Sequence, residues 1–251
     1  MYNYALEREN IVETRKDNIV YLFGEPETHK KEVCTYGDKN NPLTSTGKPK
    51  AQAACAIREL EDIKRISNYF LTTGRIEWVR LRNNMMFVVG ICTGLRISDL
   101  LSLKIKDILT IDGIIRDNIV VYEQKTNKIN HITITDTSKK VIREYLDCIS
   151  SFNSEDYLFK SNKGGMLDTR SAHKILKTMS RDLELPYNIG THTLRKTFAY
   201  WTIKLHSNDG EVLSALQKLL NHSDQRITFA YADIDKEKQI EMYNDISDYL
   251  F

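Results

Sequence analysis

The chain of 251 residues has few cysteines, and its cysteines and histidines are not spaced as metal ligands. Cys34, Cys55, Cys92 and Cys148 lie far apart and match no zinc-ligand pattern. The six histidines include neither a His-x-His pair nor a His-Glu-x-x-His motif. Unpaired thiols without such patterns are typical of proteins in a reducing compartment. We therefore expect a cytoplasmic protein with no metal and no cofactor.

Long apolar runs are also missing. No stretch of eighteen apolar residues occurs, so the sequence predicts no membrane-spanning helix. The first residues, MYNYALEREN, are polar and lack the hydrophobic region of a secretory signal peptide. Hydrophobic residues make up 41% of the chain and charged residues 28%, as in ordinary globular proteins. A chain of this length can bury a sizeable core without disulfide or metal support.

Net charge is low overall but unevenly distributed. Residues 1–55 are neutral, residues 56–231 carry 26 Lys/Arg and 20 Asp/Glu, and residues 232–251 carry two and six. The resulting charges of +6 and −4 fit a body that binds a polyanion and a tail that docks elsewhere. Ordinary variation in surface charge explains the same counts equally well, so charge alone does not decide the function.

Two segments differ in pattern. Residues 1–55 hold three of the four prolines and little apolar periodicity, which predicts a loosely structured extension with a small hairpin near Ile19–Phe23. Residues 56–251 predict a mostly helical α+β domain with a small three-stranded antiparallel sheet. The strands are expected over 108–115, 119–123 and 129–135, with a brief strand at 157–159.

Helical periodicity marks most of the remaining segments. Gly94 is positioned to close the second helix, and Thr137 or Ser138 to cap the one after the sheet. Before the sheet, helices are expected from Ile57 to Phe70, at 76–92, and in a short stretch that begins at Ser98. After the sheet, one helix is expected from its cap at Thr137 or Ser138 to Ser150, and others at 168–184, 192–206, 210–220, 224–231 and in a tail over 235–251.

Three short segments carry the chemically informative residues. Thr93-Gly94-Leu95-Arg96 places an arginine just past a helix end, with Asp99 three residues later, able to orient its guanidinium. His192 and Arg195 lie at i and i+3 near a helix start, where an anion is favoured. Each pair alone is more simply an ordinary ion pair or surface pair.

The third segment is Leu219-Leu220-Asn221-His222, followed nine residues after the histidine by Tyr231. Either residue alone would be unremarkable. Together these residues resemble the tyrosine recombinase (phage-type integrase) family over residues 56–240. The resemblance rests on the ordered set Arg96, His192, Arg195, His222 and Tyr231, and on the intact motifs Thr-Gly-Leu-Arg and His-x-Leu-Arg. Asn221 departs from the family, which usually has glycine there. Asparagine also tolerates a left-handed backbone.

This resemblance implies a role for each residue. Tyr231 would attack a DNA phosphodiester to form a 3′-phosphotyrosyl link, and Arg96 and Arg195 would bind the phosphate. His192 and His222 would assist proton transfer and hydrogen bonding.

The family's remaining residue is a lysine on a β-hairpin that protonates the departing 5′-oxygen. Lys125 is assigned to this role here, and Lys128 is the alternative.

The implied partners are double-stranded DNA with specific recombination sites and further copies of the chain in a tetrameric synapse, with accessory DNA-bending proteins possible. The outcome would be integration, excision or inversion. With only about 55 residues before the catalytic domain, the chain looks like small members without a full N-terminal clamp. A type IB topoisomerase-like enzyme and a catalytically idle DNA-binding regulator are the alternatives. The tail, residues 235–251, would dock on a neighbouring protomer or pack on its own domain.

Overall fold

The computed structural model describes residues 15–16, 19–20, 53–149, 151–206 and 211–221. The chain divides into two compact units, residues 1–34 and 35–251, which are considered separately. In the first unit, the two-residue strands β1 (Arg15–Lys16) and β2 (Ile19–Val20) pair antiparallel. Of the hairpin predicted near Ile19–Phe23, only Ile19 and Val20 fall within the described residues.

The second unit contains, in its described part, eight helices and one two-stranded sheet. Its elements in chain order are α1 (Leu60–Thr72), α2 (Glu77–Thr93), α3 (Ile97–Leu101), α4 (Ile105–Ile108), β3 (Asn118–Tyr122), β4 (Ile129–Thr133), α5 (Asp136–Cys148), α6 (Thr169–Asp182), α7 (Thr191–Leu205) and α8 (Val212–Leu219). The predicted mostly helical α+β class is confirmed. The helices expected at 224–231 and 235–251 lie outside the described residues.

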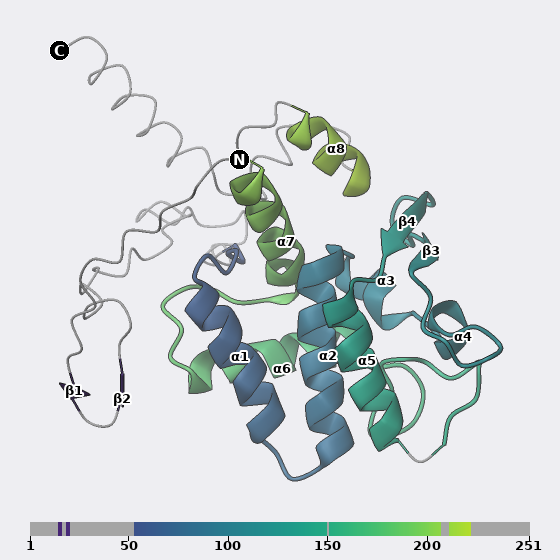
Figure 1. Ribbon diagram of the computed structural model, residues 1–251, viewed down its shortest axis with the longest axis horizontal. Helices are drawn as coiled ribbons and strands as arrows, with labels where there is room; N and C mark the ends of the chain where they lie inside the picture. The colour runs from purple at the N-terminus through teal and green to yellow at the C-terminus, as the bar shows by residue number, and fades with distance from the viewer. Residues whose placement is uncertain (1–14, 17–18, 21–52, 150, 207–210, 222–251) are drawn as a thin grey trace, which may run out of the picture. The chain divides into compact units, whose positions relative to one another are not determined.

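Helix α2 is the centre of this unit and packs against α1, α5 and α7 (Figure 1). Its sequence shows why: Met85, Met86, Phe87 and Val89 point in different directions around the helix and are all buried. A helix that is apolar on several sides must be covered on several sides. The Arg96 segment leaves from the end of this central helix, which gives it a rigid support.

Two glycines let α7 approach α2 closely. A Cβ atom on Gly90 would lie 2.7 Å from Leu194 Cδ1, and one on Gly94 would lie 2.5 Å from Phe198 Cδ1. Gly94 also ends α2 in the left-handed region with φ of 63°, as the sequence predicted for its C-terminal cap. The close packing brings Arg195 of α7 to the end of α2.

The segment before α1 lies along α7. The backbone N–H of Ile57 donates to Thr197 Oγ1 at 2.9 Å, and the Trp201 indole donates to the Ile57 carbonyl at 3.0 Å. These bonds hold Ile57 outside the helix. The prediction that the first helix begins at Ile57 is therefore wrong, and the helix begins at Leu60.

The expected third strand is also absent from the described residues. Ile108 ends α4, and the chain then folds back on itself, so that Thr110 N–H donates to the Ile114 carbonyl at 2.8 Å. Leu109 and Ile115 form a single bridge across this turn. Because these residues pair with each other, they do not pair with β3, and the sheet has two strands instead of three. Residues 157–159 likewise contribute one isolated bridge, Lys104 to Tyr157.

Strands β3 and β4 pair antiparallel, with Asn118 opposite Thr133 and Tyr122 opposite Ile129. Alternate residues of each strand are buried and exposed, as expected for a sheet with one covered face. Helix α5 follows β4, and Thr135 caps it by accepting from the Ser138 N–H at 3.3 Å. The prediction of Thr137 or Ser138 as the cap is therefore wrong. No helix in the described ranges is long and apolar enough to cross a membrane.

Candidate active site

Four of the predicted site residues lie in described segments that converge. Arg96 is the residue before α3, Lys125 lies in the turn between β3 and β4, and His192 and Arg195 belong to the first turns of α7. His222 and Tyr231 lie outside the described residues, and their assignment stays a prediction.

The imidazole of His192 is surrounded by positive charge. Burial lowers its pKa below the ordinary histidine value, and the cations Arg195, Lys125, Lys196 and Arg96 lower it further. A charge must be near to act in this way, so these side chains share one neighbourhood although they come from three segments. Such a concentration of cations attracts an anion.

Arg195 is buried and joins two other segments. Its Nη1 donates to the Gly94 carbonyl at 2.9 Å, and its Nη2 donates to the Leu220 carbonyl. The first carbonyl belongs to the cap that precedes Arg96, and the second lies two residues before His222. The guanidinium therefore connects three chain segments that carry predicted site residues.

Arg96 pairs with a carboxylate that the sequence did not identify. Its Nη1 lies 2.6 Å from Glu123 Oε2, and the Arg96 side chain is 17% exposed whereas that of Glu123 is fully buried. Asp99, which we expected to orient Arg96, is also buried, but its Oδ1 accepts from the backbone N–H of Gln124 at 3.1 Å. Among the described residues, the carboxylate within ion-pair distance of Arg96 is Glu123.

Glu123 collects several donors. Thr126 Oγ1 donates to its Oε2 at 2.6 Å, Asn130 Nδ2 to its Oε1 at 3.4 Å, and the Asn221 side chain also donates to it. Burial alone would raise the pKa of this carboxyl, but these hydrogen bonds and Arg96 outweigh burial and lower it. A signal existed in the sequence: Glu123 continues the inward alternation of Ile119 and Val121, where a charged residue requires partners.

The hairpin turn presents Lys125 and Lys128 differently. Glu123 N–H donates to the Lys128 carbonyl and Asn127 N–H to the Glu123 carbonyl, each at 2.9 Å, and both lysine side chains are exposed. Lys125 is one of the cations that lower the pKa of His192, and Lys128 is not among them. This proximity favours Lys125 as the lysine of the site.

Comparison with known proteins assigns the chain. The sequence profile of the phage integrase family matches residues 59–238. The chain belongs to this family. The prediction of a tyrosine recombinase, a site-specific recombination enzyme, is thereby confirmed at the level of the family.

Relatives and solved structures agree with this assignment. The chain is 35% identical to the probable integrase/recombinase YoeC of Bacillus subtilis, over 72% of this chain and 90% of that protein. It is 29% identical to the tyrosine recombinase XerD of Oceanobacillus iheyensis, over 65% of this chain and 54% of XerD. The chain thus spans about half the length of this XerD.

The fold resembles that of the XerA recombinase, with a TM-score of 0.59 at 22% identity, over 78% of this chain and 66% of XerA. It also resembles XerH bound to a palindromic difH substrate after cleavage, with a TM-score of 0.59 at 22% identity, over 76% and 53%.

The asparagine that replaces the usual glycine of this family fits its position. Asn221 has φ of 49°, so the left-handed conformation considered from the sequence is confirmed. Its side chain, unlike a glycine, also reaches Glu123. In this integrase-family chain the substitution therefore keeps the turn and adds a hydrogen bond to the site.

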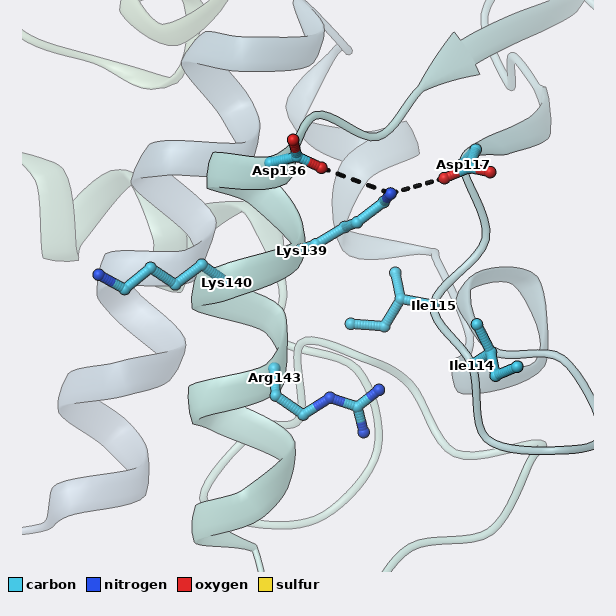
Figure 2. Close-up of a pocket in the computed structure, with 7 residues that line it drawn as sticks. All are labelled: Ile114, Ile115, Asp117, Asp136, Lys139, Lys140 and Arg143. Atoms are coloured by element: carbon cyan, nitrogen blue, oxygen red, sulfur yellow. Dashed lines mark hydrogen bonds and ion pairs between the residues drawn. The ribbon is translucent and has the colours of Figure 1, made fainter.

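A second basic region of this integrase-family chain lies at the start of α5 (Figure 2). There Lys139 Nζ lies 2.6 Å from Asp117 and 3.6 Å from Asp136, and Arg143 donates to the Gly113 carbonyl at 3.1 Å. Lys139 and Arg143 already have anionic or carbonyl partners, and these contacts join α5 to the loop before β3. None of the predicted site residues lines it.

Proposed function

We propose that this protein is a site-specific DNA recombinase whose nucleophile is Tyr231. The observation that supports this function is the convergence of Arg96, Lys125 and Arg195 around His192, whose pKa is lowered by burial and by these cations. A DNA phosphodiester is the anion that such a cluster accommodates, and a positively charged, preorganised site stabilises the charge that develops during its cleavage.

The two arginines neutralise the scissile phosphate. A guanidinium keeps its charge at every physiological pH and offers a planar fork that matches phosphate oxygens. Arg96 is partly exposed and held by Glu123, and Arg195 lies deeper, held by the carbonyls of Gly94 and Leu220. Their positions are fixed before DNA arrives, so little reorganisation is needed in the transition state.

Cleavage transfers the phosphate from one oxygen to another. The Tyr231 oxygen attacks phosphorus and forms the 3′-phosphotyrosyl bond while the bond to the 5′-oxygen breaks. Neutral His192 helps to accept the tyrosine proton, His222 donates a hydrogen bond to the phosphate, and Lys125 gives a proton to the departing 5′-oxygen. The new ester conserves the bond energy, so the reverse reaction with another 5′-hydroxyl rejoins a strand without an energy source.

Recombination needs several copies of the chain on two DNA sites. We propose a tetrameric synapse on double-stranded DNA in which residues 235–251 dock on a neighbouring protomer, with DNA-bending proteins as possible accessories. The net charge of −4 over residues 232–251, against +6 over 56–231, favours protein rather than DNA as the surface for this segment.

The test is covalent trapping with a tyrosine control. Purified wild-type protein, Tyr231→Phe and Tyr157→Phe are incubated with nicked duplexes that tile the DNA on both sides of the gene. Wild type and Tyr157→Phe should give a denaturant-resistant protein–DNA adduct, because Tyr157 lies beside Lys104 and outside the cluster. Tyr231→Phe should bind DNA and give none, since only the hydroxyl is lost.

Three results would contradict the proposal. An adduct with Tyr231→Phe of wild-type intensity would remove this residue from the mechanism. Absence of any adduct with the wild type would argue for a DNA-binding protein without cleavage activity. Relaxation of supercoiled DNA without exchange between two copies of the cleaved sequence would instead indicate a topoisomerase.

A further inference from the structure

The buried carboxylate of Glu123 lies where the segments of the proposed site meet. Its donors come from four places: Arg96 before α3, Thr126 in the hairpin turn, Asn130 in β4 and Asn221 after α8. The turn carries Lys125, and Asn221 directly precedes His222 in the sequence. The Glu123 side chain thus contacts Arg96 itself, the turn that carries Lys125, and the residue that precedes His222.

A carboxylate in this position requires a compensating function. Removing an ion from water costs several kcal/mol, which an ion pair and hydrogen bonds offset but seldom exceed. An apolar side chain at the inward position after Ile119 and Val121 would extend the core at lower cost. Unlike an apolar side chain, the carboxylate fixes the orientation of each donor that bonds to it.

Arg96 has the greatest need of such a partner. Its side chain is long and partly exposed, and it leaves from an extended residue at the start of a five-residue helix. Without an anchor, the guanidinium would lose rotamer entropy when it closes on a phosphate. The 2.6 Å contact with Glu123 fixes one end of the fork beforehand.

The rest of the network keeps Glu123 itself in place. The neighbouring N–H of Gln124 donates to the buried Asp99 at 3.1 Å, and Asn130 Nδ2 also donates to the Leu219 carbonyl at 3.0 Å. Asp99 therefore acts on the hairpin, and through it on Arg96, by a longer route than the direct ion pair expected from the sequence.

We propose that Glu123 is the positioning residue of this site, which orients Arg96 toward the scissile phosphate and joins the Lys125 turn to the segment that leads into His222. The proposal rests on the proposed function, since it concerns the same cleavage step. Glu123 does not touch the DNA. It acts through the arginine and through the backbone of the turn.

The test compares Glu123→Gln with Glu155→Gln at the cleaved sequence. Glutamine keeps the shape and an acceptor for Thr126 but removes the charge that holds Arg96. Glu155→Gln is the matched control, because this exposed carboxylate pairs with Lys104 and Lys106 at 2.8 and 2.6 Å, outside the cluster. The single-turnover cleavage rate at saturating DNA should fall about tenfold or more in Glu123→Gln. DNA affinity and the melting temperature should change little.

A second substrate separates positioning from a general structural defect. In a duplex with a methylphosphonate at the scissile position, a methyl group replaces one non-bridging oxygen, so the phosphate is neutral and depends less on Arg96. The defect of Glu123→Gln should shrink on this duplex, in parallel with that of Arg96→Ala. An equal loss on both duplexes, or wild-type cleavage on the ordinary one, would overturn the proposal.

Failure of the proposed function looks different, because then the wild type itself forms no adduct. Should Glu123→Gln not fold, Asn221→Gly carries the test, since glycine accepts the positive φ and removes one donor to Glu123. A drop of roughly two- to fivefold on the ordinary duplex is expected, on the order of one net hydrogen bond. Wild-type rates for that variant on both duplexes would refute the positioning role.

Discussion

The two cation-rich regions of the described chain differ in what holds their charges. Around the start of α7, the arginines are anchored by a buried carboxylate and by backbone carbonyls, and burial together with the surrounding cations lowers the pKa of His192. At the start of α5, Lys139 lies between two exposed aspartates (Figure 2). Carbonyls orient a guanidinium without cancelling its charge, whereas an aspartate neutralises it. Lys139 is therefore neutralised where it stands, whereas Arg195, held by two backbone carbonyls, keeps its full charge for a phosphate.

The largest effect is expected from the removal of an arginine that carbonyls hold. Arg195→Ala should lower the cleavage rate by at least about 10²-fold, as when one preorganised donor to a developing anion is lost. It should also destabilise the fold by about 2–4 kcal/mol, because the carbonyls of Gly94 and Leu220 lose a buried donor. Single-turnover cleavage and urea unfolding measure the two effects.

The control for this variant is Arg181→Ala, whose guanidinium is exposed and pairs with the neighbouring Asp182. It should cleave and unfold as the wild type does. Arg195→Lys should rescue poorly, because an ammonium cannot reach two carbonyls with a planar fork. Near-normal cleavage by Arg195→Lys would mean that charge alone, without its fixed orientation, is sufficient.

A smaller effect is expected at the turn, where the charge is exposed. Lys125→Ala should slow cleavage of an ordinary duplex by about 10²-fold, within the range of general acid catalysis. On a duplex with sulfur in place of the bridging 5′-oxygen, the leaving group needs no proton, and the defect should nearly vanish. Lys128→Ala serves as the control. Equal defects of Lys125→Ala on both duplexes would exclude this lysine as the acid and direct the same test to Lys128.

A third prediction uses pH. Burial and the cations around His192 lower its pKa below the ordinary value of about 6.5, so the imidazole stays neutral until the pH falls below that value. Cleavage that depends on neutral His192 should be fully present above the ordinary pKa and decline as the pH falls through the lowered one. In Lys125→Met this decline should move to higher pH, since one repelling charge is gone. NMR titration of the imidazole would detect the same shift, and an unchanged pKa would contradict it.

The sequence predicted those parts of the site that local pattern specifies. Gly94 was expected to cap α2 because few residues accept a positive φ at a helix end, and the structure confirms it. Short sequence motifs identify Arg96, His192 and Arg195. What the sequence did not predict depends on contacts between distant segments. Glu123 lies 27 positions from its partner Arg96, so no helical spacing relates the two.

Other errors have the same origin. The spacing of apolar residues predicts that a helix starts at Ile57. The backbone of Ile57 is instead hydrogen-bonded to Thr197 and Trp201, about 140 residues away in the chain. The β-rich composition of residues 108–115 predicts a strand, yet Ile108 ends α4 and the turn between Leu109 and Ile115 lets these two residues pair with each other. Local propensity allows both outcomes, and tertiary partners select one.

The smallest effect should follow from the removal of Lys139, a cation that two aspartates already neutralise. Lys139→Ala abolishes the contacts with Asp117 and Asp136 at the start of α5, and hydrogen bonding to Asp117 raises the pKa of this lysine while it lowers that of the aspartate. Exposed pairs of this kind contribute little to stability. The melting temperature, the cleavage rate and the salt dependence of DNA binding should therefore stay close to wild type. A salt dependence that weakened by one phosphate contact would show that this lysine leaves its aspartates for DNA. The neutralised region would then belong to the DNA-binding surface, and the contrast between the two regions would fail.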